Sequence, residues 1–338
     1  MTDTMTKTKR WTRRPEGSNW GEFGEDDQIG RLNLITPEMR KAAAAEIKEG
    51  LCFVLSLPLD YPGGEAPDNP RLKPRLFARS LGEAGPLYNL PMGRLICSDD
   101  AVELTLQYST QWDSLAHIGA FFDVDGSGEK VPVYYNGYRA HKDIVGPDGD
   151  KPPCAHCLGI ENMAMTGVQG RGILFDFVRA YGTGLTLIDY DKMMRVIDDQ
   201  KIDVRRGDFA LFYTGYGDAV MAGKKNPDQA LLLRTGAALD GRDKRLLQWI
   251  DDAGLVSLIS DNPAVEHLPA DLDPTSHDML PLHEHCIFKL GIHLGEYFWL
   301  SELAEWLREN NRSSFLFTGP PLRLPGAVGS PASAVATV

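Results

Sequence analysis

The second half of the chain alternates short apolar runs with amphipathic segments of helical spacing. Residues 172–177, 208–213 and 255–260 have the length and composition of buried strands, whereas residues 191–199 and 243–253 repeat their apolar positions with a helical period. Strands interleaved with helices predict an α/β protein, although the pattern leaves the strand order open. No Gly-x-Gly-x-x-Gly motif follows a strand and no phosphate-binding loop is present, so nothing in the sequence indicates nucleotide binding.

The first half of the chain contains one clear helix signal and one long irregular stretch. Thr36, Pro37 and Gly50 frame a predicted helix, with the threonine as N-cap, the proline in the first turn and the glycine beyond the end. Residues 58–94 are rich in proline and glycine and have no clear period. They are predicted to form a long loop or arm that covers an active site or a partner subunit.

A row of polar side chains follows in residues 101–113. If this segment is one strand, its polar positions share a single face, opposite Tyr108 and Trp112. These positions are Glu103, Thr105, Gln107, Ser109, Gln111 and Asp113. His117 follows a predicted bend and could return to the same face. Such a row faces either water or a polar pocket, and Trp112 is predicted to lie in the core.

Composition excludes several classes of partner. The net charge of −12 argues against binding to nucleic acid or to an anionic membrane surface, but a few arginines could still hold a small anion. No run approaches the roughly eighteen apolar residues of a membrane span. The five cysteines are few and odd in number, which favours a cytoplasmic protein. Cys154 and Cys157 lack a second pair to complete a four-ligand zinc site, and we interpret them as loop residues of open role.

The polar stretch ending at His117 resembles the motif His-x-Gly-Thr-His-x-Asp-x-Pro-x-His. This is the metal-ligand motif of the cyclase/hydrolase family that includes bacterial kynurenine formamidase and isatin hydrolase. Thr110, Asp113 and His117 match it, whereas Gln107 and Gln111 stand where the family usually has histidines. The chain thus resembles a Gln-Trp-Asp variant subgroup.

Five further blocks resemble the same family in the same order. They are residues 19–36, 170–176, 207–215, 283–296 and 329–331. The resemblance implies the swivelling β/β/α fold, with a mixed sheet and flanking helices. It further implies a single catalytic domain over residues 19–338. The composition of the first residues, rich in threonine, lysine and arginine, predicts that residues 1–18 form a flexible tail. A homodimer or higher homo-oligomer is also expected from the family.

The resemblance implies that Asp113, His283 and Glu296 form one site. When this chain is aligned with the family block at Gly291 and Glu296, the histidine of the block falls on His283 and not on His285. If a divalent metal is bound, these three residues are its expected ligands. Zinc, manganese or magnesium could then occupy the site.

The two glutamines bear on whether a metal is present at all. An amide oxygen is a weaker ligand than imidazole and prefers harder ions, so Gln111 is expected to be at most a fourth ligand. If the site has lost its metal, Gln107 and Gln111 would instead bind the substrate by orienting its carbonyl group.

The predicted function is hydrolysis of an amide, cyclic amide, lactone or related small carbonyl compound. His117 would accept a proton from water, and His283 or Glu296 would help deliver it to the leaving group, with a metal polarising the carbonyl. A first alternative is metal-free acid–base catalysis by the same residues and Asp113, such as cyclisation, dehydration or isomerisation. A second alternative is a non-catalytic small-molecule-binding protein. The sequence does not indicate the identity of the substrate.

Overall fold

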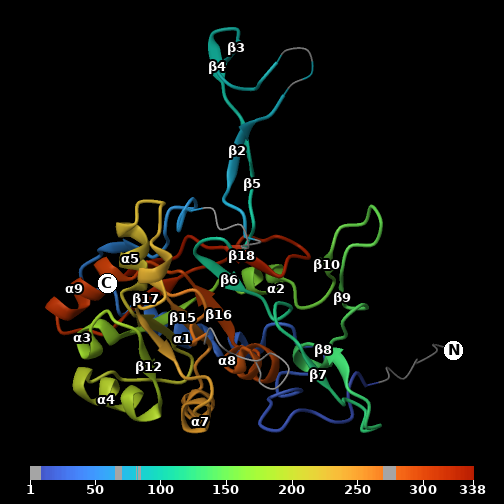
Figure 1. Cartoon of the computed structure of the whole chain (residues 1–338), viewed down its shortest axis with the longest axis vertical. Coiled ribbons are helices and arrows are strands. Elements are labelled where there is room, and N and C mark those ends of the chain that lie inside the picture. Colours follow the sequence, from blue (N-terminus) through green and yellow to red (C-terminus); the bar gives the residue numbers. More distant parts are fainter. Residues whose placement is uncertain (1–8, 65–70, 81, 83–84, 269–278) are drawn as a thin grey trace.

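The computed structural model describes residues 9–64, 71–80, 82, 85–268 and 279–338. Within these residues, nine strands form a curled sheet at the centre of the body (Figure 1). In order across the sheet they are β1 (Cys52–Val54), β19 (Val335–Thr337), β17 (Ser314–Thr318), β11 (Gln169–Asp176), β13 (Phe209–Tyr213), β15 (Ser257–Ser260), β16 (His293–Glu296), β6 (Gln111–Asp113) and β18 (Gly329–Pro331). The four strands from β11 to β16 run parallel and the others pair antiparallel, so the sheet is mixed.

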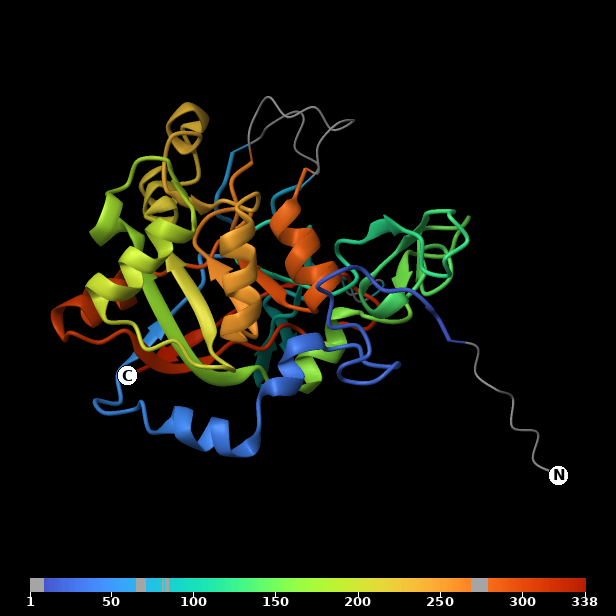
Figure 2. The same ribbon diagram turned by 90° about the horizontal axis from the view of Figure 1, so that it is seen from below.

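Helices cover both faces of this sheet (Figure 2). One face carries α4 (Tyr190–Gln200), α7 (Lys244–Ala253) and α8 (Pro281–His283), which continues into the π-helical segment η4 (Glu284–Leu290). The other face carries α1 (Pro37–Ala44), α2 (Ile160–Met165) and α9 (Ser301–Glu309). Because side chains alternate along each strand, both faces bury an apolar cluster. The predicted α/β class, with a mixed sheet between helices, is confirmed.

Smaller elements surround this body. They are η1 (Gly30–Leu34), β7 (Ala120–Phe122), β8 (Val131–Val133), η3 (Tyr135–Gly137), β9 (Ile144–Val145), β10 (Cys154–Ala155), α3 (Phe177–Tyr181), β12 (Thr186–Ile188), α5 (Tyr216–Ala222), α6 (Gln229–Leu232) and β14 (Ala237–Leu239). None of the helices in the described ranges is both long and apolar enough to cross a membrane.

The strands and helices predicted in the second half of the chain are confirmed as β11, β13, β15, α4 and α7. Each of the two helices begins at an aspartate whose carboxylate accepts a backbone N–H of the first turn, Asp189 in α4 and Asp243 in α7. The first predicted helix also begins at its predicted N-cap, Thr36. However, α1 ends at Ala44, well before Gly50.

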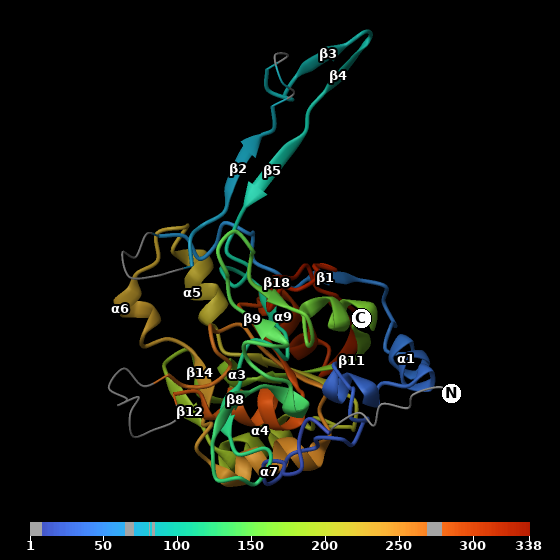
Figure 3. The ribbon, with the colours of Figure 1, turned by 90° about the vertical axis from the view of Figure 1, so that its right-hand side faces the viewer.

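A two-stranded arm projects from the body (Figures 1 and 3). It contains β2 (Arg75–Ala78), β3 (Leu90–Met92), β4 (Leu95–Cys97) and β5 (Asp100–Glu103), with β2 paired to β5 and β3 to β4. The projecting part therefore begins later than the predicted arm of residues 58–94 and extends beyond it through β5.

The prediction of one strand over residues 101–113 is wrong. β5 belongs to the arm, whereas β6 lies in the main sheet between β16 and β18. The chain turns between them, and Thr110 fixes the start of β6 because its hydroxyl donates to the carbonyl oxygen of Tyr297, the residue directly after β16. Of the predicted polar row, only Gln111 and Asp113 enter the main sheet.

Part of the predicted tail also has a defined place. Residues 1–8 lie outside the described residues, but Trp11 packs against Trp20 with ring centroids 6.2 Å apart. The backbone amide of Thr12 donates to Val124 O at 2.8 Å. Residues near Trp11 are therefore held against the body instead of being free.

The arm exposes large apolar side chains, which suggests a protein contact. Leu95 and Ile96 at its tip are each 72% exposed, and Leu76 and Met92 are also exposed. Burying such side chains stabilises association, and contiguous exposed apolar surface marks interaction sites. We propose that the arm packs against a second copy of the chain.

Replacement of Leu95 and Ile96 together by aspartate is therefore expected to lower the order of the oligomer. Light scattering should give a wild-type mass above the 37.3 kDa of one chain and a smaller mass for the variant. Leu233→Asp is the matched control, because Leu233 is equally exposed but lies on the body after α6. A wild-type protein that is monomeric at micromolar concentration would contradict the proposal.

Candidate active site

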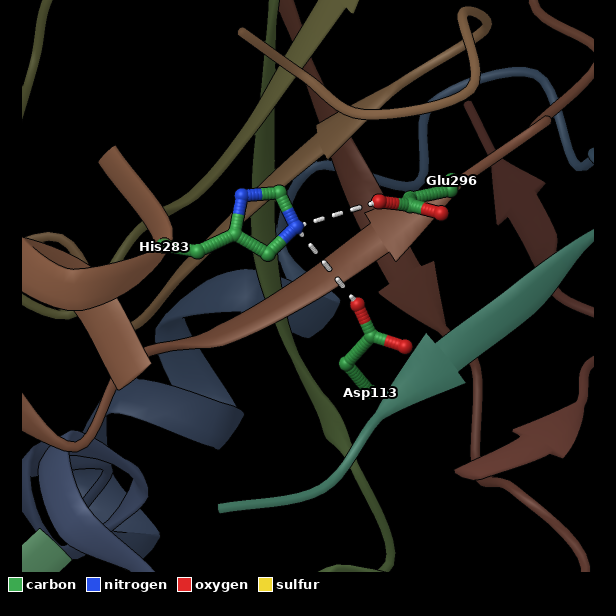
Figure 4. Close-up of side chains that lie close together, drawn as sticks. All are labelled: Asp113, His283 and Glu296. Carbon is green, nitrogen blue, oxygen red and sulfur yellow. Dashed lines mark ion pairs between the residues drawn. The ribbon is translucent and has the colours of Figure 1, made fainter. Parts of the chain in front are cut away.

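Three buried side chains from separate elements converge at one end of the sheet (Figure 4). Asp113 lies at the end of β6, Glu296 at the end of β16, and His283 at the end of α8. His283 Nε2 is 3.4 Å from Glu296 Oε1 and 4.0 Å from Asp113 Oδ2. One ligand atom from each residue lies within 4.8 Å of the others. The structure thus brings together three residues that are far apart in the sequence, and we call them the triad.

Gln111 orients one member of the triad. It lies directly opposite Glu296 in the antiparallel pairing of β6 with β16. Its Nε2 donates to Glu296 Oε2 at 2.8 Å, which leaves Glu296 Oε1 facing His283. Trp112 points to the opposite face, where it is buried and its indole N–H donates to Gly319 O, as its predicted core role requires.

Glu266 orients a second member and was not predicted from the sequence. Its carboxylate accepts the backbone N–H groups of Leu282 and His283, both at 3.0 Å, and His283 Nδ1 at 2.7 Å. Because a carboxylate must accept, Nδ1 carries the proton and Nε2 is left to face the triad. No local motif contains Glu266. Its backbone forms a β-bridge with Leu239, the last residue of β14, so its position beside His283 depends on the fold and not on sequence spacing.

The environment of the triad changes the protonation of its members. Burial disfavours charge on His283, but hydrogen bonds to Glu266 and Glu296 outweigh it and raise the pKa of His283 to about 10. Burial, followed by repulsion from Asp113, raises the pKa of Glu296 to about 7. Without a metal, an imidazolium at His283 therefore neutralises part of the carboxylate charge.

Asp113 gives the clearest indication that a cation belongs here. Its side chain is fully buried, and neither carboxylate oxygen has a hydrogen-bond partner in the described part of the chain. A buried carboxylate without partners is costly unless a cation compensates it. Two carboxylates and one imidazole nitrogen form a ligand set that suits zinc, manganese or magnesium. The residues present therefore fit a divalent metal.

His117 stands beside the triad, at its solvent side. Its Nε2 is 3.8 Å from Asp113 Oδ1, and its side chain retains 21% exposure. The turn after β6 holds it there, because its backbone N–H donates to Ser114 O at 3.0 Å. An imidazole in this place can exchange protons with both the pocket and the solvent.

Other predicted candidates lie outside the triad. Gln107 is half-buried against Gly329 of β18, and among the described residues no hydrogen bond joins it to the triad. The ring of His285 turns away and lies 3.0 Å from Leu247 O. Cys154 lies beside His156 on the separate β10 segment, with Sγ 3.5 Å from Nδ1.

Comparisons with known proteins agree with this fold. Residues 34–267 match the model of the Cyclase family, described as "Putative cyclase". A crystal structure of a novel cyclase is 31% identical, covers 95% of this chain and 97% of its own, and superposes with a TM-score of 0.76. A search of curated proteins found no match.

Two more distant structures share the fold alone. Isatin hydrolase A from Labrenzia aggregata is 12% identical, with 88% of this chain and 95% of that chain covered and a TM-score of 0.56. Isatin hydrolase A from Ralstonia solanacearum is 14% identical, with 89% and 97% covered and a TM-score of 0.54.

Proposed function

This chain belongs to the Cyclase family, and we propose that it is a metal-dependent hydrolase of an amide, cyclic amide, lactone or related carbonyl compound. The observation that carries the proposal is the buried carboxylate of Asp113 beside His283 and Glu296, which has no hydrogen-bond partner among the residues that the structure describes. The isatin hydrolases that share the fold make a cyclic amide one class to test.

Asp113, His283 and Glu296 would hold the metal. A divalent ion bound there would polarise a carbonyl group and lower the pKa of a water molecule. Glu266 accepts the Nδ1 proton of His283 and so keeps Nε2 pointed at the site, where it could bind a metal after losing its own proton. Gln111 holds the Glu296 carboxylate in one orientation. These two residues thus preorganise the ligands before substrate arrives.

His117 is the residue placed to move protons. It lies next to Asp113 but keeps contact with solvent, so a water molecule or a leaving group can reach its ring. In this mechanism, its neutral Nε2 accepts a proton from the attacking water. The resulting imidazolium returns the proton to the leaving amine or alkoxide, which completes hydrolysis.

The first experiment measures metal binding and turnover together. Purified protein is stripped with a chelator, titrated with zinc, manganese or magnesium, and assayed on formanilides, dihydrocoumarins and isatin. We expect turnover that depends on one of these ions. Turnover that survives chelation would favour the metal-free acid–base enzyme, and metal binding without turnover of any compound would contradict the assigned substrate classes.

The His117→Ala variant tests the proton transfer. Loss of a general base typically lowers rates about 10²–10⁴-fold, and we expect a fall in kcat of this size with metal affinity unchanged. His156→Ala is the control, because His156 lies outside the triad on another segment. A His117→Ala variant with wild-type kcat would remove this residue from the mechanism.

A further inference from the structure

Two residues next to the active site have backbone conformations that their side chains disfavour. Tyr297, directly after Glu296, has a φ of 56°, and Val265, directly before Glu266, has a φ of 60°. Positive φ is uncommon outside glycine, and for a β-branched or bulky side chain it is a genuine outlier. Such conformations gather at functional sites and persist only where the surrounding structure holds them. Tyr297 and Val265 therefore need fixed hydrogen-bond partners.

One buried residue, Asn262, is the partner of both. It follows shortly after the end of β15, and only 4% of it is exposed. Its Oδ1 accepts the Val265 N–H at 2.7 Å, and its backbone carbonyl oxygen accepts the Tyr297 N–H at 3.0 Å. Asn262 thus fixes the backbone beside two glutamates that are far apart in the sequence.

Asn262 is itself anchored to the sheets. Its Nδ2 donates to Ala237 O in β14 at 3.0 Å, and its backbone N–H donates to Ser260 Oγ in β15 at 3.2 Å. Because only the amide nitrogen can donate to the Ala237 carbonyl, the amide oxygen must face Val265. The side chain therefore has a single orientation.

Both contacts of Asn262 lead to the triad. Beside Val265, the Glu266 carboxylate accepts His283 Nδ1 at 2.7 Å. Before Tyr297, Glu296 Oε1 lies 3.4 Å from His283 Nε2 (Figure 4). Since φ sets the direction of the chain on either side of a residue, relaxation of Val265 or Tyr297 would displace the adjoining glutamate from His283.

We propose that Asn262 is a positioning residue of the active site. It fixes the two disfavoured backbone conformations, and it thereby keeps Glu266 against His283 and Glu296 in the triad. It acts through these two glutamates and not as a ligand. This inference rests on the proposed hydrolase function, and it adds a residue outside the triad on which the ligand geometry depends.

The variants Asn262→Ala and Asn262→Asp separate positioning from packing. Both remove the donor to Ala237 O, but only alanine removes the acceptor of the Val265 N–H. Calorimetric titration of the stripped protein with zinc or manganese measures the effect. We expect Asn262→Ala to lower the affinity roughly 10–100-fold, as the loss of a partner of metal ligands typically does. Asn262→Asp should bind the ions with nearly wild-type affinity. Equal losses in the two variants would overturn the proposal, and so would wild-type affinity in Asn262→Ala.

Asn136→Ala is the matched control. Asn136 is also buried, and its amide accepts the Gly21 N–H at 3.1 Å and donates to Gly24 O at 3.0 Å. The variant should lose stability in thermal unfolding, because it leaves buried backbone groups unpaired, and it should keep its metal affinity. If it lowered metal affinity as much as Asn262→Ala, general destabilisation would explain both results and the proposal would be overturned.

Val265→Gly in the Asn262→Ala background tests the backbone directly. Glycine adopts positive φ without a steric cost, so Glu266 can keep its place without Asn262. We expect the double variant to regain most of the lost metal affinity, although removal of the buried valine side chain makes it less stable. The absence of any recovery would show that Asn262 does not act through Val265, and this would overturn the proposal.

A measurement without metal separates failure of this inference from failure of the proposed function. Nuclear magnetic resonance with isotope-labelled histidine detects the Nδ1 proton that His283 donates to Glu266, assigned by its absence from His283→Gln. The resonance should disappear in Asn262→Ala and remain in Asn262→Asp and Asn136→Ala. If the wild type binds no metal, the proposed function fails and these spectra alone decide the inference. A resonance that persists in Asn262→Ala, or that the wild type lacks, would overturn it.

Discussion

Replacing Asp113 by asparagine is expected to remove metal binding and activity while making the metal-free protein more stable. Loss of a ligand carboxylate should lower metal affinity by at least roughly 100-fold, since outer partners alone cost 10–100-fold. The free energy of unfolding of the metal-free protein should rise by about 1–3 kcal/mol. The buried carboxylate that is removed has no hydrogen-bond partner in the described structure and repels Glu296. Calorimetric titration with zinc or manganese and thermal unfolding after chelation measure the two effects.

Asp261→Asn is the matched control for this prediction. Asp261 is also fully buried, but its carboxylate accepts the Thr214 N–H and hydroxyl at 2.9 and 2.6 Å and the Gly215 N–H at 2.9 Å. The same substitution there removes acceptors from satisfied donors, so it should destabilise the protein and leave metal affinity unchanged. If Asp113→Asn were destabilising to a similar extent, Asp113 would be a structural residue.

Local patterns were sufficient to predict three strands of the parallel core, but not their order in the sheet. The strands β11, β13 and β15 each contain a short apolar run, and the helices α4 and α7 each begin at an aspartate N-cap. At these elements the sequence pattern and the fold agree. The prediction of one strand over residues 101–113 failed because alternation of polar and apolar residues does not show where the chain leaves one sheet and enters another. What separates β5 from β6 is the long-range contact of Thr110 with Tyr297 O.

The site shows the same limit. The choice of His283 over His285 came from the family register, and the structure places only His283 in the triad. The family register does not include Glu266. This residue lies 17 positions before His283, and only the fold brings its carboxylate to His283 Nδ1. Spacing also placed Gln107 and Gln111 on one face, whereas the turn before β6 leads only Gln111 to the triad.

Replacing Gln111 by histidine is expected to raise zinc affinity roughly 100-fold, or about 3 kcal/mol. Position 111 lies opposite Glu296 in the sheet, and its side chain already contacts that carboxylate. An imidazole there would add a strong nitrogen donor to the carboxylates of Asp113 and Glu296. Activity need not rise, because the substitution also removes the hydrogen bond that orients Glu296.

Gln107→His supplies the comparison, because the same chemical change is made at a residue that lies against Gly329. Calorimetric titration of the stripped proteins with zinc should show tighter binding for Gln111→His and wild-type binding for Gln107→His. Equal affinities for Gln111→His and the wild type would mean that position 111 does not face a metal. Asp113, His117, His283 and Glu296 would then be better explained as a metal-free acid–base site, in which the imidazolium of His283 balances the buried carboxylates.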